Sequence, residues 1–120
     1  YFAAVGIPTE APMAPPAQLA AAQLLDPECV CLSMSVTGRA RDTVDATRAA
    51  RDAGATIILL TGALRGPLVN LADLTFCART SHRSPLTPFV NRYALEAVAF
   101  AMFAGIAQLR EANLALRHTN

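Results

Sequence analysis

Residues 29–54 read CVCLSMSVTGRARDTVDATRAARDAG, and this stretch decides the fold class. It opens inside a short, mainly apolar run over 28–34 that is rich in valine and cysteine, which is typical of a short buried strand. A helical pattern follows almost at once, over about 40–53, with alanines at helical spacing and charged side chains mostly on other faces. Gly54 is placed to end that helix. A buried strand that leads directly into a helix predicts an α/β unit.

The same alternation continues along the chain. Two further apolar strands are predicted at 56–61 and 74–78. Helices are predicted on either side of them, at 17–25, 67–72 and about 89–112. Strands that are apolar throughout and separated by helices indicate a parallel sheet covered on both faces. We therefore expect an α/β fold of the doubly wound, flavodoxin-like type, with three layers and one domain.

Composition and charge limit the class of protein. The chain has 120 residues, of which 53% are hydrophobic and 16% charged, as expected for one folded domain with one core. Ten basic residues are nearly balanced by nine acidic ones, so this chain offers no surface for nucleic acid. Its most apolar stretch, 97–107, is far shorter than the roughly 20 residues that a bilayer requires. A cytoplasmic domain without a membrane span is therefore predicted.

The three cysteines, Cys29, Cys31 and Cys77, all lie in apolar runs and lack the paired spacing of a metal site. We interpret them as reduced thiols of the core in a cytosolic protein, with a metal or redox role as the alternative. The sequence pattern indicates no bound metal and no cofactor.

The candidate site lies between the first clear strand and the helix that follows it. In parallel sheets, ligands bind at the carboxyl ends of the strands, and a helix N-terminus there suits a phosphate. Two hydroxyls can donate hydrogen bonds to such an anion, a glycine lets the backbone approach it, and an arginine adds positive charge. The predicted ligand is a small phosphorylated molecule, and the residues predicted to bind it are Ser35, Val36, Thr37, Gly38, Arg39 and Ala40.

Neither of the common phosphate motifs is present, because the patterns GxxxxGK[ST] and GxGxxG are both missing. The alternative interpretation of the loop is purely structural. Thr37 would then be the N-cap of the helix, and Gly38 a turn residue. Spacing alone leaves both interpretations open.

A series of short motifs runs through the chain in a fixed order. It comprises Ser35, Thr37 and Gly38, then Asp42, Thr43 and Val44, then Ala53, Gly54 and Ala55, and finally Pro67, Leu68, Ala72 and Asp73. The series resembles the SIS (sugar isomerase) phosphosugar-binding domain, in particular the version found in RpiR-type bacterial transcriptional regulators. That family's pattern is a strand ending in Ser-x-Ser-Gly-x-Thr, a Lys/Arg-Asp/Glu-Thr-Val helix start, an Ala-Gly-Ala turn, a strand ending in Thr and a Ser-Pro-Leu-x-x-x-Ala-Asp segment.

Two positions depart from the family's pattern. Ala40 stands where the family usually has the threonine that completes the phosphate cradle, and Gly66 replaces a serine. The resemblance also implies that the family's first strand, its glycine/serine loop and most of its first helix precede residue 1. Residues 1–6, YFAAVG, would then be the last turn of a helix that Gly6 caps. On this basis residues 1–120 form one SIS domain that is incomplete at its N-terminus.

The resemblance implies three candidate functions. The leading hypothesis is the effector-sensing domain of a transcriptional regulator, which binds a phosphorylated sugar and catalyses no reaction. DNA would then be bound only through a helix-turn-helix domain upstream of these residues. The second hypothesis is a ketose–aldose phosphosugar isomerase, and the third is a degenerate SIS domain that only dimerises.

An isomerase would need a base, and two residues are candidates. Glu96 is the only charge between Arg92 and Arg110, so burial would raise its pKa toward that of a useful base. The alternative for Glu96 is an ion pair with Arg92, four residues earlier. His82 follows the third strand in a polar loop, where it either faces the ligand or is simply solvated.

The helix predicted at 89–112 is apolar around almost its whole circumference. One face is expected to cover the sheet. The remaining apolar surface is expected to meet another subunit, which predicts a homodimer or a higher homo-oligomer.

Overall fold

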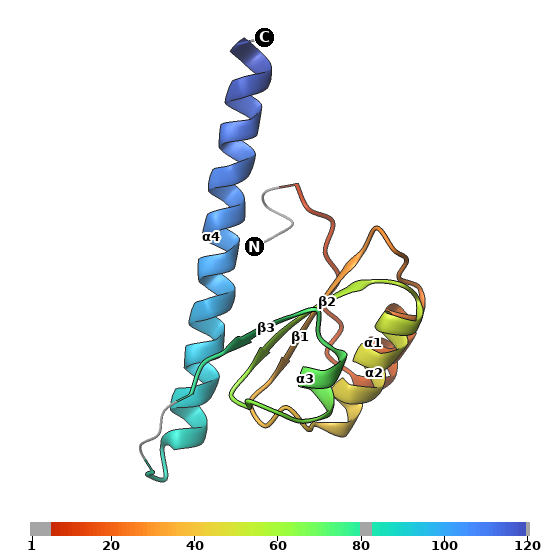
Figure 1. Ribbon diagram of the computed structural model, residues 1–120, viewed down its shortest axis with the longest axis vertical. Coiled ribbons are helices and arrows are strands. Elements are labelled where there is room, and N and C mark those ends of the chain that lie inside the picture. Colours follow the sequence, from red (N-terminus) through yellow and green to blue (C-terminus); the bar gives the residue numbers. More distant parts are fainter. Residues whose placement is uncertain (1–5, 80–82, 120) are drawn as a thin grey trace.

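The computed structural model describes residues 6–79 and 83–119, and its elements follow the predicted order (Figure 1). They are α1 (Pro15–Gln23), β1 (Val30–Ser35), α2 (Arg41–Asp52), β2 (Thr56–Thr61), α3 (Pro67–Leu71), β3 (Leu74–Cys77) and α4 (Thr87–Thr119). Residues 1–5, in which the last turn of a helix was expected, lie outside the described residues. Gly6 itself has the left-handed backbone of a cap residue, with a φ of 80°.

The three strands form one parallel sheet in the order β1-β2-β3. Ser35 pairs with Thr61, and Thr61 pairs with Cys77, so the carboxyl ends of all three strands meet at one edge. Helices α1, α2 and α3 lie on one side of the sheet and α4 lies on the other (Figure 1). The predicted α/β fold, with a parallel sheet between helical layers, is confirmed.

Small residues let the helices of the first layer lie close to the sheet. Ala50 of α2 and Ala22 of α1 pack with Ile57, and Val44 packs with Leu59 and α3. Ala50, Ile57 and Leu59 are completely buried, and burying a side chain of leucine size contributes about 1.5–3 kcal/mol. The alanines that were predicted at helical spacing on α2 therefore face the sheet.

The amino-terminal edge of the sheet is tied by Asp73, which precedes β3. Its carboxylate Oδ2 accepts a hydrogen bond of 2.8 Å from the backbone N–H of Ile57, and its own N–H donates to the Ile57 carbonyl at 2.9 Å. Asp73 therefore has a structural role at the edge of the sheet opposite to residues 35–40.

Helix α4 differs from the prediction in its length. Its N-terminus is fixed by Ser84, whose Oγ accepts from the Leu86 N–H at 3.1 Å, and by Thr87, whose Oγ1 accepts from the Ser84 N–H at 2.9 Å. The predicted end at residue 112 is wrong, because the helix continues to Thr119. Residues 113–119 contain neither glycine nor proline, so nothing in their sequence stops the helix.

Helix α4 covers only the middle of its side of the sheet. It contacts β2, whose Leu60 is completely buried, and Leu95 is the one buried residue of α4. Strand neighbours that share this face remain exposed by 38–58%: Val30, Leu32, Met34, Leu74 and Phe76. The prediction that helices cover both faces of the sheet is therefore confirmed for β2 only. On the side of α4, β1 and β3 remain largely uncovered, because one helix about 10 Å wide spans about two strands.

By length and composition alone, α4 is also apolar enough to cross a membrane. The prediction against a membrane span considered only residues 97–107, whereas the helix that contains them has 33 residues. This is weak evidence for a membrane, since long helices of soluble proteins have the same composition.

The prediction of core thiols is partly wrong. Cys29 and Cys31 are half-buried, and Cys77 is exposed at the end of β3. All three are free thiols. Within residues 6–79 and 83–119, no group of three histidine, cysteine or acidic side chains is placed to hold a metal ion.

Candidate functional site

Residues 36–40 form a tight loop after β1, and its two hydroxyls shape it. Ser35 is buried, and its Oγ accepts a hydrogen bond of 3.1 Å from the Gly38 N–H. Thr37 is exposed, and its Oγ1 accepts from the Arg39 N–H at 3.2 Å. Each hydroxyl keeps its own proton available for donation. The hydroxyls thus build the loop and can still donate to a ligand.

Gly38 is required by the conformation and by the contacts of this loop. Its φ of 70° lies in the left-handed region, and a Cβ at this position would lie 2.9 Å from the Ala63 Cβ and 3.2 Å from the Thr61 Oγ1. Thr61 is completely buried, and its Oγ1 also accepts from the Ala63 N–H at 3.1 Å. The loop after β1 and the loop after β2 approach each other closely here, so no larger residue fits at position 38.

Two backbone hydrogen bonds join the loop at 36–40 to the segment after β2, one to the loop at 62–66 and one to α3. The Gly62 N–H donates to the Val36 carbonyl at 3.1 Å, and the Leu68 N–H donates to the Gly38 carbonyl at 3.4 Å. The two loops after β1 and β2 therefore form one connected surface at the carboxyl edge of the sheet.

The start of α2 carries no side-chain cap. Its N-cap residue is Ala40, so the prediction of Thr37 as N-cap is wrong, whereas Gly38 is indeed a turn residue. A helix leaves its first N–H groups without partners inside the helix, and these groups carry partial positive charge. Among the described residues, the N–H groups of residues 40–43 have no acceptor.

This arrangement refines which amides can bind an anion. The sequence placed the anion against residues 35–40, but the N–H groups of Gly38 and Arg39 are already used inside the loop. The donors that remain include the two hydroxyl protons and the N–H groups of residues 40–43. An anion would therefore lie closer to the first turn of α2 than the sequence indicated.

Of the two candidate bases for an isomerase, the structure describes only Glu96, which is exposed on α4. Glu96 is 54% exposed, and its Oε1 lies 3.8 Å from the Arg92 Nε. The alternative of an ion pair is thus confirmed, and Glu96 is not buried. His82 lies outside the described residues.

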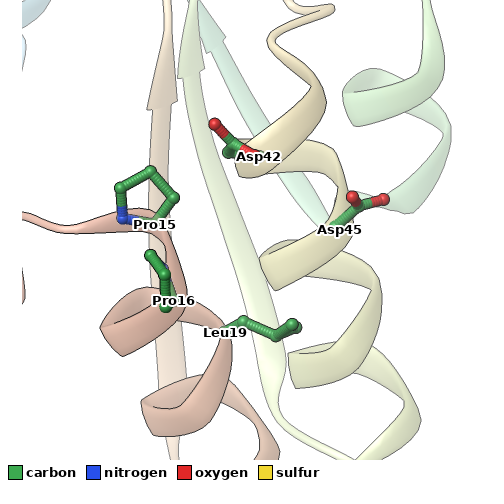
Figure 2. A pocket seen from close by; sticks show the side chains of 5 residues that line it. All are labelled: Pro15, Pro16, Leu19, Asp42 and Asp45. Carbon is green, nitrogen blue, oxygen red and sulfur yellow. The ribbon is translucent and has the colours of Figure 1, made fainter.

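A hollow of about 250 Å³ lies elsewhere, between the first turns of α1 and α2 (Figure 2). It is lined by Pro15, Pro16, Leu19, Asp42 and Asp45. Its two polar groups are carboxylates, which repel a phosphate. The hollow is therefore separate from the loop at 36–40 and is unsuited to the predicted ligand.

Comparison with known proteins now identifies the fold family. The family model of the SIS domain matches residues 6–105. The chain belongs to the SIS domain family. The resemblance that its motifs indicated is therefore confirmed, and no curated protein matches the chain.

Two solved structures share the fold of this SIS domain. One is the Vibrio vulnificus NanR protein complexed with ManNAc-6P, with a TM-score of 0.78, 13% identity and 96% coverage of this chain. The other is described as a hypothetical protein, with a TM-score of 0.54, 14% identity and 90% coverage. The match covers 45% and 54% of those two chains, so this chain spans about half the length of each.

Proposed function

We propose that this SIS domain binds a phosphorylated sugar at residues 35–40 and serves as the effector-sensing domain of a transcriptional regulator. The observation that carries the proposal is the uncapped start of α2, directly behind a loop with two hydroxyls at the carboxyl edge of the sheet. Membership of the SIS family supports a phosphosugar as ligand. The fold shared with NanR, a protein solved with ManNAc-6P, agrees with this choice.

The phosphate would be held by neutral donors and by the helix. The hydroxyls of Ser35 and Thr37 would donate to two of its oxygens, and the N–H groups of residues 40–43 would approach the others. A helix N-terminus stabilises an anion by up to about 2 kcal/mol in favourable geometry. Each hydrogen bond to a charged oxygen contributes about 1.5–3 kcal/mol. Together these terms suffice for specific binding of a small ligand.

A sensor is proposed in preference to an isomerase because of the state of Glu96. Isomerisation needs a base beside the ligand, and Glu96 is exposed and paired with Arg92. In the proposed regulator, ligand binding would control a separate DNA-binding domain, and the protein would be cytoplasmic and homo-oligomeric.

Titration calorimetry tests the site in the intact protein. Candidate hexose and N-acetylhexosamine 6-phosphates are titrated into the wild type and into a Ser35→Ala/Thr37→Ala variant. We expect the variant to bind more than tenfold more weakly, since it loses two donors to the phosphate. Thr75→Ala, which removes an exposed hydroxyl on β3, is the matched control and should bind as the wild type does. Equal affinity of the double variant would refute this site.

Incubation with each sugar phosphate separates the sensor from the enzyme. Conversion of an aldose phosphate to its ketose, followed by NMR, would favour the isomerase. Binding without conversion supports the sensor.

A further inference from the structure

Three arginines stand in the three loops at the carboxyl edge of the sheet, one after each strand. Arg39 follows β1, Arg65 follows β2 and Arg79 follows β3, and all three are exposed. None of them forms an ion pair within residues 6–79 and 83–119. The parallel order of the strands brings them to one edge, although they are up to 40 residues apart in the sequence.

The loop at 62–66 anchors this group, because two of the arginines contact it. The Arg39 Cγ and Nε both lie 3.8 Å from the position of a Cβ at Gly66, so this side chain lies across Gly66. The Arg79 Cβ lies 3.7 Å from the corresponding position at Gly62. Arg65 belongs to the loop itself. The glycines at 62 and 66 give the arginines from both neighbouring loops room to approach.

The acidic residues nearby do not neutralise this charge. The described parts of the three loops, 36–40, 62–66 and 78–79, contain no aspartate or glutamate. Asp42 lies in the first turn of α2, but it lines the hollow beside α1 (Figure 2). Asp73 is bound to the Ile57 N–H at the other edge of the sheet. Three like charges at one edge of the sheet, with no acidic residue in the described parts of the same loops, favour the binding of anions.

One phosphate does not account for all of this charge. The proposed phosphate position at residues 35–40 is already served by two hydroxyls, uncapped N–H groups and the helix dipole. The Arg39 side chain lies beside the neighbouring loop, with its Cγ and Nε 3.8 Å from the position of a Cβ at Gly66. Its charge is therefore available, with that of Arg65 in the same neighbouring loop, to a second group of a bound sugar.

We propose that the ligand of this domain is a sugar phosphate with a second anionic group, a carboxylate or a second phosphate, and that Arg39, with Arg65 and Arg79, recognises that group. This inference rests on the proposed function, because it assumes that the first phosphate binds at residues 35–40. Arginine suits the role, since its planar guanidinium pairs with either anion through two parallel hydrogen bonds.

Two matched pairs of probes test the proposal by calorimetry on the intact protein at a fixed salt concentration. Glucitol 6-phosphate and 6-phosphogluconate differ by the carboxylate, and fructose 6-phosphate and fructose 1,6-bisphosphate differ by the second phosphate. We expect the doubly anionic member of at least one pair to bind tenfold or more tightly than its partner. The pair that shows the preference identifies the second group as a carboxylate or a phosphate.

Variants then assign the preference to the arginines. Arg39→Gln should reduce the preference to about threefold or less, because it should weaken binding of the doubly anionic probe more than binding of the singly anionic one. Arg65→Gln and Arg79→Gln should each reduce it as well. Arg48→Gln, which changes an exposed arginine in the middle of α2, is the matched control and should keep the full preference.

The failures of the two proposals are distinguishable. If the singly anionic probes bind at residues 35–40 and neither pair shows a preference, the second anionic group is refuted and the proposed function stands. A preference that survives in all three arginine variants also refutes the assignment. If none of the four probes and no inorganic phosphate binds, both proposals are overturned.

Discussion

The replacement Gly38→Ala offers the sharpest test of how the loop at 36–40 is built. Gly38 has a φ of 70°, and an added Cβ would lie 2.9 Å from the Ala63 Cβ. Left-handed backbone costs an alanine about 1–2 kcal/mol. Forcing the extra methyl group against a packed neighbour costs about 1–3 kcal/mol more. We therefore expect Gly38→Ala to lower the free energy of unfolding by about 2–5 kcal/mol.

Gly54→Ala is a matched control at the other edge of the sheet. Gly54 has a φ of 96°, and its added Cβ would lie 2.9 Å from the Pro27 Cγ. Backbone strain and crowding are therefore similar at the two positions. Gly54 ends α2 far along the chain from residues 35–40, so its replacement should destabilise the protein to a comparable extent without changing the ligand site.

Urea unfolding and calorimetry together distinguish the two effects. Both variants should unfold at lower urea concentrations than the wild type. Only Gly38→Ala should weaken phosphosugar binding, by tenfold or more, because a shifted loop misplaces both hydroxyls. Titrations are made at a temperature at which each variant is folded.

Two results would contradict this reasoning. Wild-type stability of Gly38→Ala would mean that the loop tolerates a side chain, and that its left-handed turn is not needed. Wild-type affinity in a destabilised Gly38→Ala protein would separate the loop from the ligand site.

Three further predictions concern the start of α2, the start of β3 and the exposed surface of α4. Ala40→Thr should cap α2 and so raise the free energy of unfolding by about 0.5–2 kcal/mol. It should also tighten the binding of a simple sugar phosphate. Weaker binding would show that the ligand needs the space at residue 40. Asp73→Ala should cost about 1–3 kcal/mol in urea unfolding because it leaves the N–H of the buried Ile57 without its side-chain acceptor, and an unchanged midpoint would contradict that role. Light scattering at micromolar concentration should give at least a homodimer, because aromatic residues of α4 such as Phe100 are more than half exposed; a monomer would refute pairing through this helix.

The sequence predicts the strands well, because their apolar runs are continuous and bounded by turn residues. β2 lies at 56–61 as predicted, and the other two strands are displaced by one or two residues at most of their ends. α1 begins at Pro15, two residues before the prediction, since the first turn of a helix needs no N–H donors and tolerates proline. The end of α4 was missed because no residue after 112 marks it.

The candidate site was predicted in position but not in its internal bonds. The hydroxyls of Ser35 and Thr37 and the left-handed Gly38 are all recognisable from the motif. The hydrogen bonds by which the two hydroxyls hold the loop together depend on its backbone conformation, and the spacing of residues in the sequence does not determine that conformation. The sequence shows Thr61 only as the last residue of the strand predicted at 56–61. In the fold its Oγ1 lies 3.2 Å from where a Cβ at Gly38 would stand, although the two residues are 23 apart in the sequence. Only the folded sheet brings these two residues together.

The two departures from the family's pattern are connected through Arg39. Ala40 removes a hydroxyl from the phosphate cradle, and Gly66 removes a side chain from the loop that faces it. The Arg39 side chain lies 3.8 Å from where a Cβ at Gly66 would stand, which is an ordinary contact distance, and the φ of 135° at Gly66 would strain a serine there. The hydroxyl is missing at residue 40, and the Arg39 side chain lies beside residue 66. If the ligand carries the second anionic group proposed above, the two departures fit a change from a ligand that needs a further neutral donor to one that carries a further negative charge.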